Sequence, residues 1–178
     1  MEHDNTGDAR AATGQLLSAG HRRILYLGHN AGYTTSEARL AGYREGLAAQ
    51  NVAHDPMIEV ASARLDRTDG YQLMCDRLAG GPPDFTAVQA ANDLVPAGAR
   101  QALCKWGLRI PDDVSLVGYD DLPPAGDIGL TTVRLPHDEL GRTTVRLALR
   151  RDRQGPVDDH VMLGTHVVVR ESIGPPGR

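Results

Sequence analysis

Polar side chains follow three apolar stretches of the sequence, at the point where each stretch ends. They are Tyr119, Asp120 and Asp121 after "VSLVG", Asn92 and Asp93 after "FTAVQAA", and, after "ILYLG" and a short loop, Thr34, Thr35, Ser36 and Arg39. A carboxylate accepts hydrogen bonds from hydroxyl groups, an amide both donates and accepts, and a guanidinium donates through a planar fork. Together these groups suit a neutral ligand that carries many hydroxyls.

Each of these side chains also has a structural interpretation that needs no ligand. Asp93 stands where the N-cap of a helix is expected, and Asp121 fits a polar turn. Asn92 can satisfy backbone groups of its own loop. Arg39 and Asp120 can form a salt bridge that closes the rim of a site without binding anything. The residue types alone leave these alternatives open.

Alternating strands and helices are needed to bring the three segments together. The apolar patterns predict strands at 23–28, 56–61, 85–90 and 113–118, and helices at 7–19, from the N-cap Ser36 to 50, at 68–81 and from the N-cap Asp93 to 106. Such alternation forms right-handed βαβ units and a mainly parallel sheet that is covered on both faces. Ligands bind beyond the carboxyl ends of these strands, so we expect the three segments on one rim.

The pattern changes after Asp121. A loop rich in Pro and Gly leads to a strand at 130–136, an amphipathic helix at 137–154 and one or two strands at 160–172. The predicted fold class is therefore α/β, with a mainly parallel sheet flanked by helices.

Composition and charge narrow the class of protein. The 178 residues suffice for one domain, or for a domain with fragments of another. A net charge of −4 indicates no basic surface for nucleic acid phosphates. No apolar run approaches the ~18 residues of a membrane span, and the polar beginning predicts no signal peptide. Cys75 and Cys104 are far apart and have no metal-ligand spacing, which favours a reduced, cytoplasmic setting and leaves one disulfide as the alternative.

The sequence signatures of several enzyme classes are absent. The chain has no GxSxG, Walker A, HExxH or GxGxxG pattern, and its 7 histidines are scattered. We therefore expect a binding protein rather than an enzyme, with neither a cofactor nor a metal.

Short motifs occur along nearly the whole chain. They are "DN" at 4–5, "GHRRILYLG" at 20–28, "SEARLAGYREGL" at 36–47, "DGYQLM" at 69–74, "FTAVQAAND" at 85–93, "GLRIPDDVSLVGYDD" at 107–121, "LTTVRLPHDELGR" at 130–142 and "VVVRES" at 167–172. In this order they resemble the effector-binding region of LacI/GalR-type bacterial transcription regulators. The motif at 107–121 combined with "LTTV" is highly specific for that family, whereas "AND" alone is weak.

The resemblance implies a set of residues that contact a small-molecule effector of the sugar type. Arg39, Asn92 and Asp120 would contact it directly. Asp4, on the hinge side of the pocket, would contribute, and the segment at Thr35 would line the same cleft. Apart from Asp4, these are positions that the strand-end argument had already selected.

The resemblance also implies a division of the chain and a homodimer. Residues 1–129 would form the C-terminal lobe of a periplasmic-binding-protein-like fold, 130–155 a crossover strand and helix of the other lobe, and 156–178 the returning strands and tail. The dimer surface would lie on the helix around Leu103 and Trp106 and on the strand that follows it.

Two departures from the family limit these expectations. Leu65 stands nearest to a position where many relatives carry an aromatic residue, which argues against a stacked, purine-like effector. The chain also lacks the DNA-binding headpiece, the hinge helix and most of the N-terminal lobe, so DNA would be reached only through an absent headpiece. The apolar face of the helix at 136–152 would then be exposed, swapped into a partner or repacked.

Two rival interpretations stay open at the level of sequence. The chain can be a stand-alone or exported sugar-binding protein of similar fold, although an exported receptor needs a signal peptide. It can also be an unrelated α/β enzyme, but no catalytic group of residues is evident. In each case we expect no membrane partner.

Overall fold

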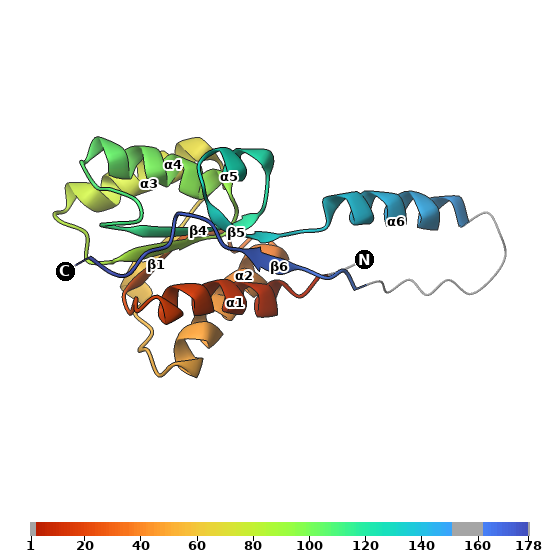
Figure 1. Ribbon diagram of the computed structural model, residues 1–178, viewed down its shortest axis with the longest axis horizontal. Helices are drawn as coiled ribbons and strands as arrows, with labels where there is room; N and C mark the ends of the chain where they lie inside the picture. Colours follow the sequence, from red (N-terminus) through yellow and green to blue (C-terminus); the bar gives the residue numbers. More distant parts are fainter. Residues whose placement is uncertain (1–2, 151–161, 178) are drawn as a thin grey trace.

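A mixed sheet of six strands forms the centre of the molecule (Figure 1). The computed structural model describes residues 3–150 and 162–177. The strands are β1 (Ile24–His29), β2 (Glu59–Ala61), β3 (Ala87–Ala90), β4 (Ser115–Asp120), β5 (Thr131–Arg134) and β6 (His166–Val168). Their order is β2-β1-β3-β4-β5-β6, with parallel pairing from β2 to β5 and an antiparallel β6. The predicted α/β class with a mainly parallel sheet is thus confirmed.

Helices cover both faces of this sheet. The helices of the described residues are α1 (Asn5–Ser18), α2 (Thr34–Ala49), α3 (Arg67–Ala79), α4 (Leu94–Lys105), α5 (Pro123–Asp127) and α6 (His137–Arg150), with a one-turn 3₁₀ helix η1 (Pro56–Ile58). Figure 1 shows α1 and α2 on one face and α3 and α4 on the other. The strand order reverses between β1 and β3, the kind of position where open α/β sheets bind ligands.

Each face of the sheet has its own apolar cluster. Tyr26 of β1 and Tyr43 of α2 are fully buried in the cluster beneath α1 and α2. Leu27, Met74 and Leu116 are fully buried in the cluster beneath α3 and α4. Burying one such side chain contributes about 1.5–3 kcal/mol. Burial on both faces explains why the strands appear in the sequence as apolar runs rather than as alternating patterns.

Both helix pairs pack at very short range through glycine. A Cβ atom on Gly98 of α4 would lie 1.9 Å from the carbonyl oxygen of Arg67, the first residue of α3. A Cβ atom on Gly42 of α2 would lie 2.1 Å from the carbonyl oxygen of Thr6 in α1. The backbones of paired helices therefore touch, which fixes where the helices begin relative to the strand ends.

The second helix begins two residues earlier than the predicted N-cap. It starts at Thr34, and the predicted N-cap Ser36 lies inside its first turn. The Ser36 hydroxyl instead accepts a hydrogen bond from the backbone N–H of Asn30 at 2.8 Å, which fastens the preceding loop. The prediction placed Ser36 at the helix end because its side chain can cap, but a loop N–H is its actual partner.

Two predicted strands are shorter than expected. The stretch 56–61 begins as η1, because the Asp55 side chain accepts from the Met57 backbone N–H, and only β2 continues as a strand. Of the stretch 160–172, β6 is the part that pairs with β5, whereas residues 160 and 161 lie outside the described ranges.

The helix α6 projects away from the sheet (Figure 1). Its side chains Leu140, Val145 and Leu149 are 37%, 58% and 71% exposed in the single chain. The strand β5 that precedes it pairs with β4 in the same sheet. The division of the chain at residue 129 stays a prediction. Residues 151–154 of the predicted helix lie outside the described ranges.

Candidate functional site

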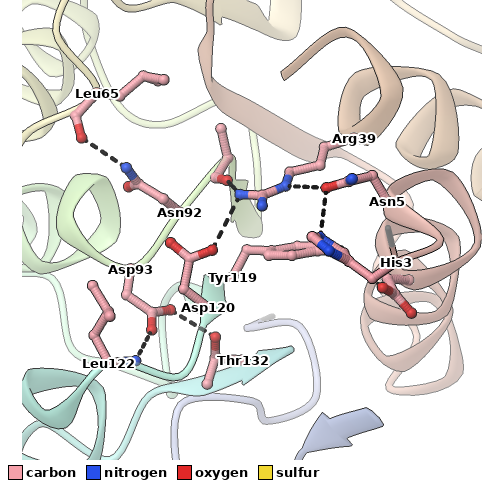
Figure 2. A network of polar contacts seen from close by, with 12 residues as sticks. His3, Asn5, Arg39, Leu65, Asn92, Asp93, Tyr119, Asp120, Leu122 and Thr132 are labelled. Carbon is pink, nitrogen blue, oxygen red and sulfur yellow. Dashed lines mark hydrogen bonds and ion pairs between the residues drawn. The ribbon is translucent and has the colours of Figure 1, made fainter. Parts of the chain in front are cut away.

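The guanidinium of Arg39 lies at the centre of the rim formed by the carboxyl ends of β3 and β4 (Figure 2). Its Nη1 atom lies 3.3 Å from a carboxylate oxygen of Asp120 and donates to the Ala91 carbonyl at 2.5 Å. Its Nε atom donates to Asn5 Oδ1 at 2.9 Å. The guanidinium carbon stands 3.6 Å from the centroid of the Tyr119 ring, a cation–π contact. Two of the predicted site residues, Arg39 and Asp120, therefore meet.

The backbone at the end of β4 is strained. Asp120 has φ 111° and Asp121 has φ 58°, both in the left-handed region that residues with a Cβ rarely adopt. Such conformations cost on the order of 1–3 kcal/mol each and cluster at functional sites. Burial raises the pKa of the Asp120 carboxyl, while Arg39 acts in the opposite direction. The strand ends at Asp120, two residues later than predicted, so this carboxylate belongs to β4 itself.

Asp121 is held by structural contacts. Its side chain is 6% exposed and forms ion pairs with Arg134 and, at 2.7 Å, with Arg170. These two cations lower the pKa of the Asp121 carboxyl, against the effect of its burial. Asp121 thus ties β4 to β5 and to the segment after β6. The sequence allowed Asp121 to be a structural turn residue, and its contacts support that interpretation.

Asn92 satisfies backbone groups, as one of its two interpretations expected. Its Nδ2 atom donates to the Leu65 carbonyl at 2.7 Å, and its Oδ1 atom accepts from the Val95 backbone N–H at 3.0 Å. Figure 2 shows the amide turned toward Leu65 and away from Arg39. Leu65 itself has φ 55°, so this contact fastens a strained loop beside the rim. An effector contact of Asn92 would require its amide to change partners.

Asp93 does not cap α4 with its side chain, contrary to its structural interpretation from the sequence. It occupies the N-cap position, but the side chain makes no capping hydrogen bond. Its two oxygens accept from the Leu122 backbone N–H at 2.8 Å and from the Thr132 hydroxyl at 2.6 Å. A Cβ atom on Gly118 would lie 2.3 Å from Asp93 Oδ1, so only glycine there admits this carboxylate. Burial raises the pKa of Asp93 to about 6.

Two other predicted residues, Asp4 and Thr35, line a groove of about 630 Å³. It is lined by His3, Asp4, Asn5, Thr6, Thr34, Thr35, Ala38 and Met162. Asp4 also caps α1, because its carboxylate accepts from the Gly7 backbone N–H at 2.8 Å. The groove adjoins the rim through Asn5, which contacts Arg39. The five predicted effector residues therefore divide into the Arg39–Asp120 pair, the groove residues, and Asn92 in its own loop.

Asn5 and Tyr119 are site residues whose roles the sequence interpretation missed. Asn5 was noted only as part of "DN", and Tyr119 only as a residue after a strand. The signal that could have found Tyr119 is its place beside Asp120 in "GYDD". For Asn5 the only signal is its place beside Asp4.

The predicted dimer residues differ in accessibility. Leu103 is fully buried in the core beneath α3 and α4, so its side chain is not available for a subunit contact. The prediction named Leu103 because the family resemblance implied a dimer surface on its helix, but the apolar side of α4 faces the sheet. Trp106 is 49% exposed and lines an apolar groove of about 440 Å³ with Leu78, Pro82, Pro83 and Leu108.

The described residues contain neither a membrane-spanning helix nor a cluster of metal ligands. No helix among them is long and apolar enough to cross a membrane. No group of three or more His, Cys, Asp or Glu side chains in residues 3–150 and 162–177 could hold a metal ion.

Comparisons with known proteins place the chain in a family. The model of the periplasmic binding protein-like domain matches residues 13–173. The regulator CelR of Thermobifida fusca is 36% identical over 97% of this chain and 51% of its own length, and GalR of Escherichia coli is 33% identical over 94% and 49%. The chain spans about half the length of these curated relatives.

Solved structures agree with this assignment. The structure of CelR in complex with cellobiose is 36% identical, with a TM-score of 0.84, and the match covers 95% of this chain and 52% of that one. A LacI-family regulator from Enterococcus faecium with bound ribose has a TM-score of 0.87 at 28% identity, over 97% and 64%. A dimeric Lac repressor has a TM-score of 0.88 at 28% identity, over 98% and 63%. The chain thus belongs to the periplasmic binding protein-like domain family and corresponds to part of the effector-binding region of LacI/GalR-type regulators.

Proposed function

We propose that this chain is the effector-sensing part of a LacI/GalR-type transcription regulator and that its effector is a sugar. The observation that carries the proposal is the Arg39–Asp120 pair at the end of β4. A guanidinium and a carboxylate offer the donors and acceptors that sugar hydroxyls require. The relatives support this ligand class, because one solved structure holds cellobiose and another holds ribose.

Asp120 has free capacity to accept hydrogen bonds, whereas Arg39 is already held in place. Within the described residues Arg39 is the one cation that contacts the Asp120 carboxylate, whose side chain is 21% exposed. Arg39 has further contacts with Ala91, Asn5 and the Tyr119 ring. A sugar whose hydroxyl donates to Asp120 therefore contacts a guanidinium that is already fixed in position. Binding then loses little conformational entropy from the Arg39 side chain.

The signal would be a shift between two conformations of the complete protein. A ligand shifts such an equilibrium only through its different affinities for the two states. We infer that α6 packs on a second lobe of that protein, and that dimerisation uses the surface near Trp106. DNA would be reached through a headpiece outside these 178 residues, in the cytoplasm. We assign the chain a binding role and no catalytic one.

Isothermal titration calorimetry with cellobiose and ribose tests the ligand class. We expect the wild-type chain to bind at least one of them, and Arg39→Ala and Asp120→Ala each to weaken that binding by at least about 30-fold. The reason is that each variant removes a charged hydrogen-bonding partner of the sugar hydroxyls, a loss on the order of 2 kcal/mol. Unchanged affinity in both variants contradicts the assigned site.

The matched control is Arg10→Ala. Arg10 lies on the exposed side of α1 in an ion pair of 3.7 Å with Glu45, in which both side chains are more than half exposed. Its removal should leave the affinity unchanged. If neither sugar binds the wild-type chain, a thermal-shift screen of further neutral sugars follows, and a result without any shift would overturn the sugar assignment.

A further inference from the structure

The carboxylate of Asp8 joins two hydroxyls that are far apart in the sequence. Its Oδ2 atom accepts a hydrogen bond from the Tyr119 hydroxyl at 2.9 Å, and its Oδ1 atom accepts one from the Thr165 hydroxyl. Asp8 lies in the first turn of α1, Tyr119 lies in β4, and Thr165 lies directly before β6. One side chain thus connects three elements, with a separate oxygen for each partner.

Tyr119 is the platform on which the guanidinium of Arg39 rests. The side chain of Tyr119 is 1% exposed, and the guanidinium carbon lies 3.6 Å from the ring centroid. The His3 ring also lies beside the Tyr119 ring, with 6.3 Å between the two ring centroids. Asp8 fixes the ring at its hydroxyl end, and the ring supports Arg39. The position of Arg39 therefore depends on Asp8 through Tyr119.

The site also contacts both segments that connect α6 to the sheet. On the outgoing side, the Asp120 carbonyl accepts from the Leu135 backbone N–H at 3.4 Å and lies 3.1 Å from His137 Nε2. On the returning side, the contact is the hydrogen bond of Thr165 to Asp8. Figure 1 shows α6 standing away from the sheet between these two segments. A change at α6 therefore reaches the site by two short paths.

We propose that Asp8 is a positioning residue that fixes Tyr119 beneath Arg39 and, through Thr165, links effector affinity to the placement of residues 162–165. This inference rests on the proposed function. Linkage is reciprocal: if effector binding favours one placement of the returning segment, that placement favours effector binding by the same factor. The Asp8 carboxylate supplies the physical connection, since charged hydrogen bonds are the stronger kind.

Four variants separate the contacts of Asp8. Asp8→Ala removes both hydrogen bonds, and Asp8→Asn keeps an oxygen acceptor at the same place. Tyr119→Phe keeps the ring beneath Arg39 but removes the hydroxyl. Thr165→Val removes the link to the returning segment alone. Circular dichroism checks that each variant is folded. If Asp8→Ala does not fold, Asp8→Asn takes its place in both measurements.

The first measurement needs no ligand. The titration midpoint of the Asp120 carboxyl, followed by ¹³C NMR, reports how closely Arg39 is held, because Arg39 lowers the Asp120 pKa. The variant Arg39→Ala removes the guanidinium completely, so the upward shift of the midpoint in this variant is the reference for full loss of the Arg39 effect. We expect a clear fraction of that shift in Asp8→Ala and Tyr119→Phe, and none in Thr165→Val. An unchanged midpoint in Asp8→Ala would overturn the positioning role.

The second measurement uses cellobiose. We expect Asp8→Ala to bind it about tenfold more weakly than the wild type, with a partial recovery in Asp8→Asn. In the wild type, cellobiose should slow hydrogen exchange of the backbone amides at 163–168. Thr165→Val should lose that protection while the Arg10→Ala control keeps it. Protection that survives in Thr165→Val would overturn the linkage.

The two measurements also distinguish this inference from the proposed function. If the wild type binds neither cellobiose nor ribose, the result counts against the sugar effector. The ligand-free titration of Asp120 then still decides whether Asp8 positions Arg39.

Discussion

Asp120 and Asp121 are adjacent in the chain, yet their carboxylates have different surroundings. Asp121 is nearly buried between Arg134 and Arg170, and these contacts hold β4, β5 and the returning segment together. Asp120 is 21% exposed, and in the described part of the molecule its carboxylate forms an ion pair with Arg39. The left-handed backbone at both residues turns the two side chains to different partners. One dipeptide thus supplies a structural anchor and a candidate ligand contact.

Asp93 gives a prediction about pH. Burial raises its folded-state pKa to about 6, above an unfolded value of ~3.9, so the folded protein binds the proton more tightly. The stability that follows from this is fully present below pH ~3.9 and is lost as the pH rises through about 6. We expect the unfolding free energy of the wild type minus that of Asp93→Asn to fall by about 2 kcal/mol between pH 4 and pH 7.

Urea denaturation of both proteins across this pH range measures the difference. The subtraction is needed because His21, whose pKa is lowered by burial, contributes in the opposite sense at overlapping pH. Asp120, whose pKa is also raised, is present in both proteins, so most of its contribution cancels. A difference that stays constant from pH 4 to pH 7 would contradict a raised Asp93 pKa.

The residue types of the site could be predicted from the sequence, but the distribution of roles could not. Asn92 and Asp93 both have side chains that cap helices, and Asn92 is the one that accepts from the backbone N–H of the first turn. Asp93 is instead drawn toward β4 and β5, where Gly118 leaves space and Thr132 donates. These partners lie 25 and 39 residues away in the sequence, so no local pattern indicates them.

At the scale of elements, the α3–α4 pair depends on Gly98. The position of its missing Cβ lies 1.9 Å from the Arg67 carbonyl oxygen and 2.6 Å from the Tyr71 backbone nitrogen. Both are backbone atoms, which cannot turn aside as the end of a side chain can. We expect Gly98→Ala to lower the unfolding free energy by about 3 kcal/mol, because the two helices must separate. Urea denaturation at neutral pH measures it.

Gly14→Ala is the matched control for this substitution. Gly14 lies inside α1, and nothing stands within 4 Å of the position of its missing Cβ. The same chemical change should here raise the unfolding free energy by about 0.5–1 kcal/mol, because alanine favours the helix. Equal effects of the two substitutions would show that close packing at Gly98 does not matter.

The order of elements was predictable because it depends on apolar runs that recur along the chain. The residues at which the helices and strands begin and end were less predictable. The helix start near Ser36 and the 3₁₀ turn at Pro56 both depend on which backbone N–H a particular side chain finds. Those contacts depend on how each loop packs in the folded protein, which the local sequence does not specify.

At the scale of the whole molecule, α6 differs from the other long helices because it does not pack on the sheet. Its Leu149 side chain is 71% exposed, whereas Leu116 in β4 is fully buried. The chain covers about half the length of its curated relatives, so a partner surface for α6 can belong to the complete protein. In the 178-residue chain, α6 should then contribute little to stability.

Two leucine substitutions test this expectation. Leu116→Ala should lower the unfolding free energy by about 2–5 kcal/mol, because it leaves a cavity in a packed core. Leu149→Ala should change it by less than about 0.5 kcal/mol, because an exposed side chain loses almost no contacts. Equilibrium urea denaturation at low protein concentration measures both. If Leu149→Ala costs more than about 1 kcal/mol, and the cost grows with protein concentration, the apolar face of α6 is covered by a second copy of the chain. A cost of that size at every concentration would instead mean that α6 folds back onto its own chain.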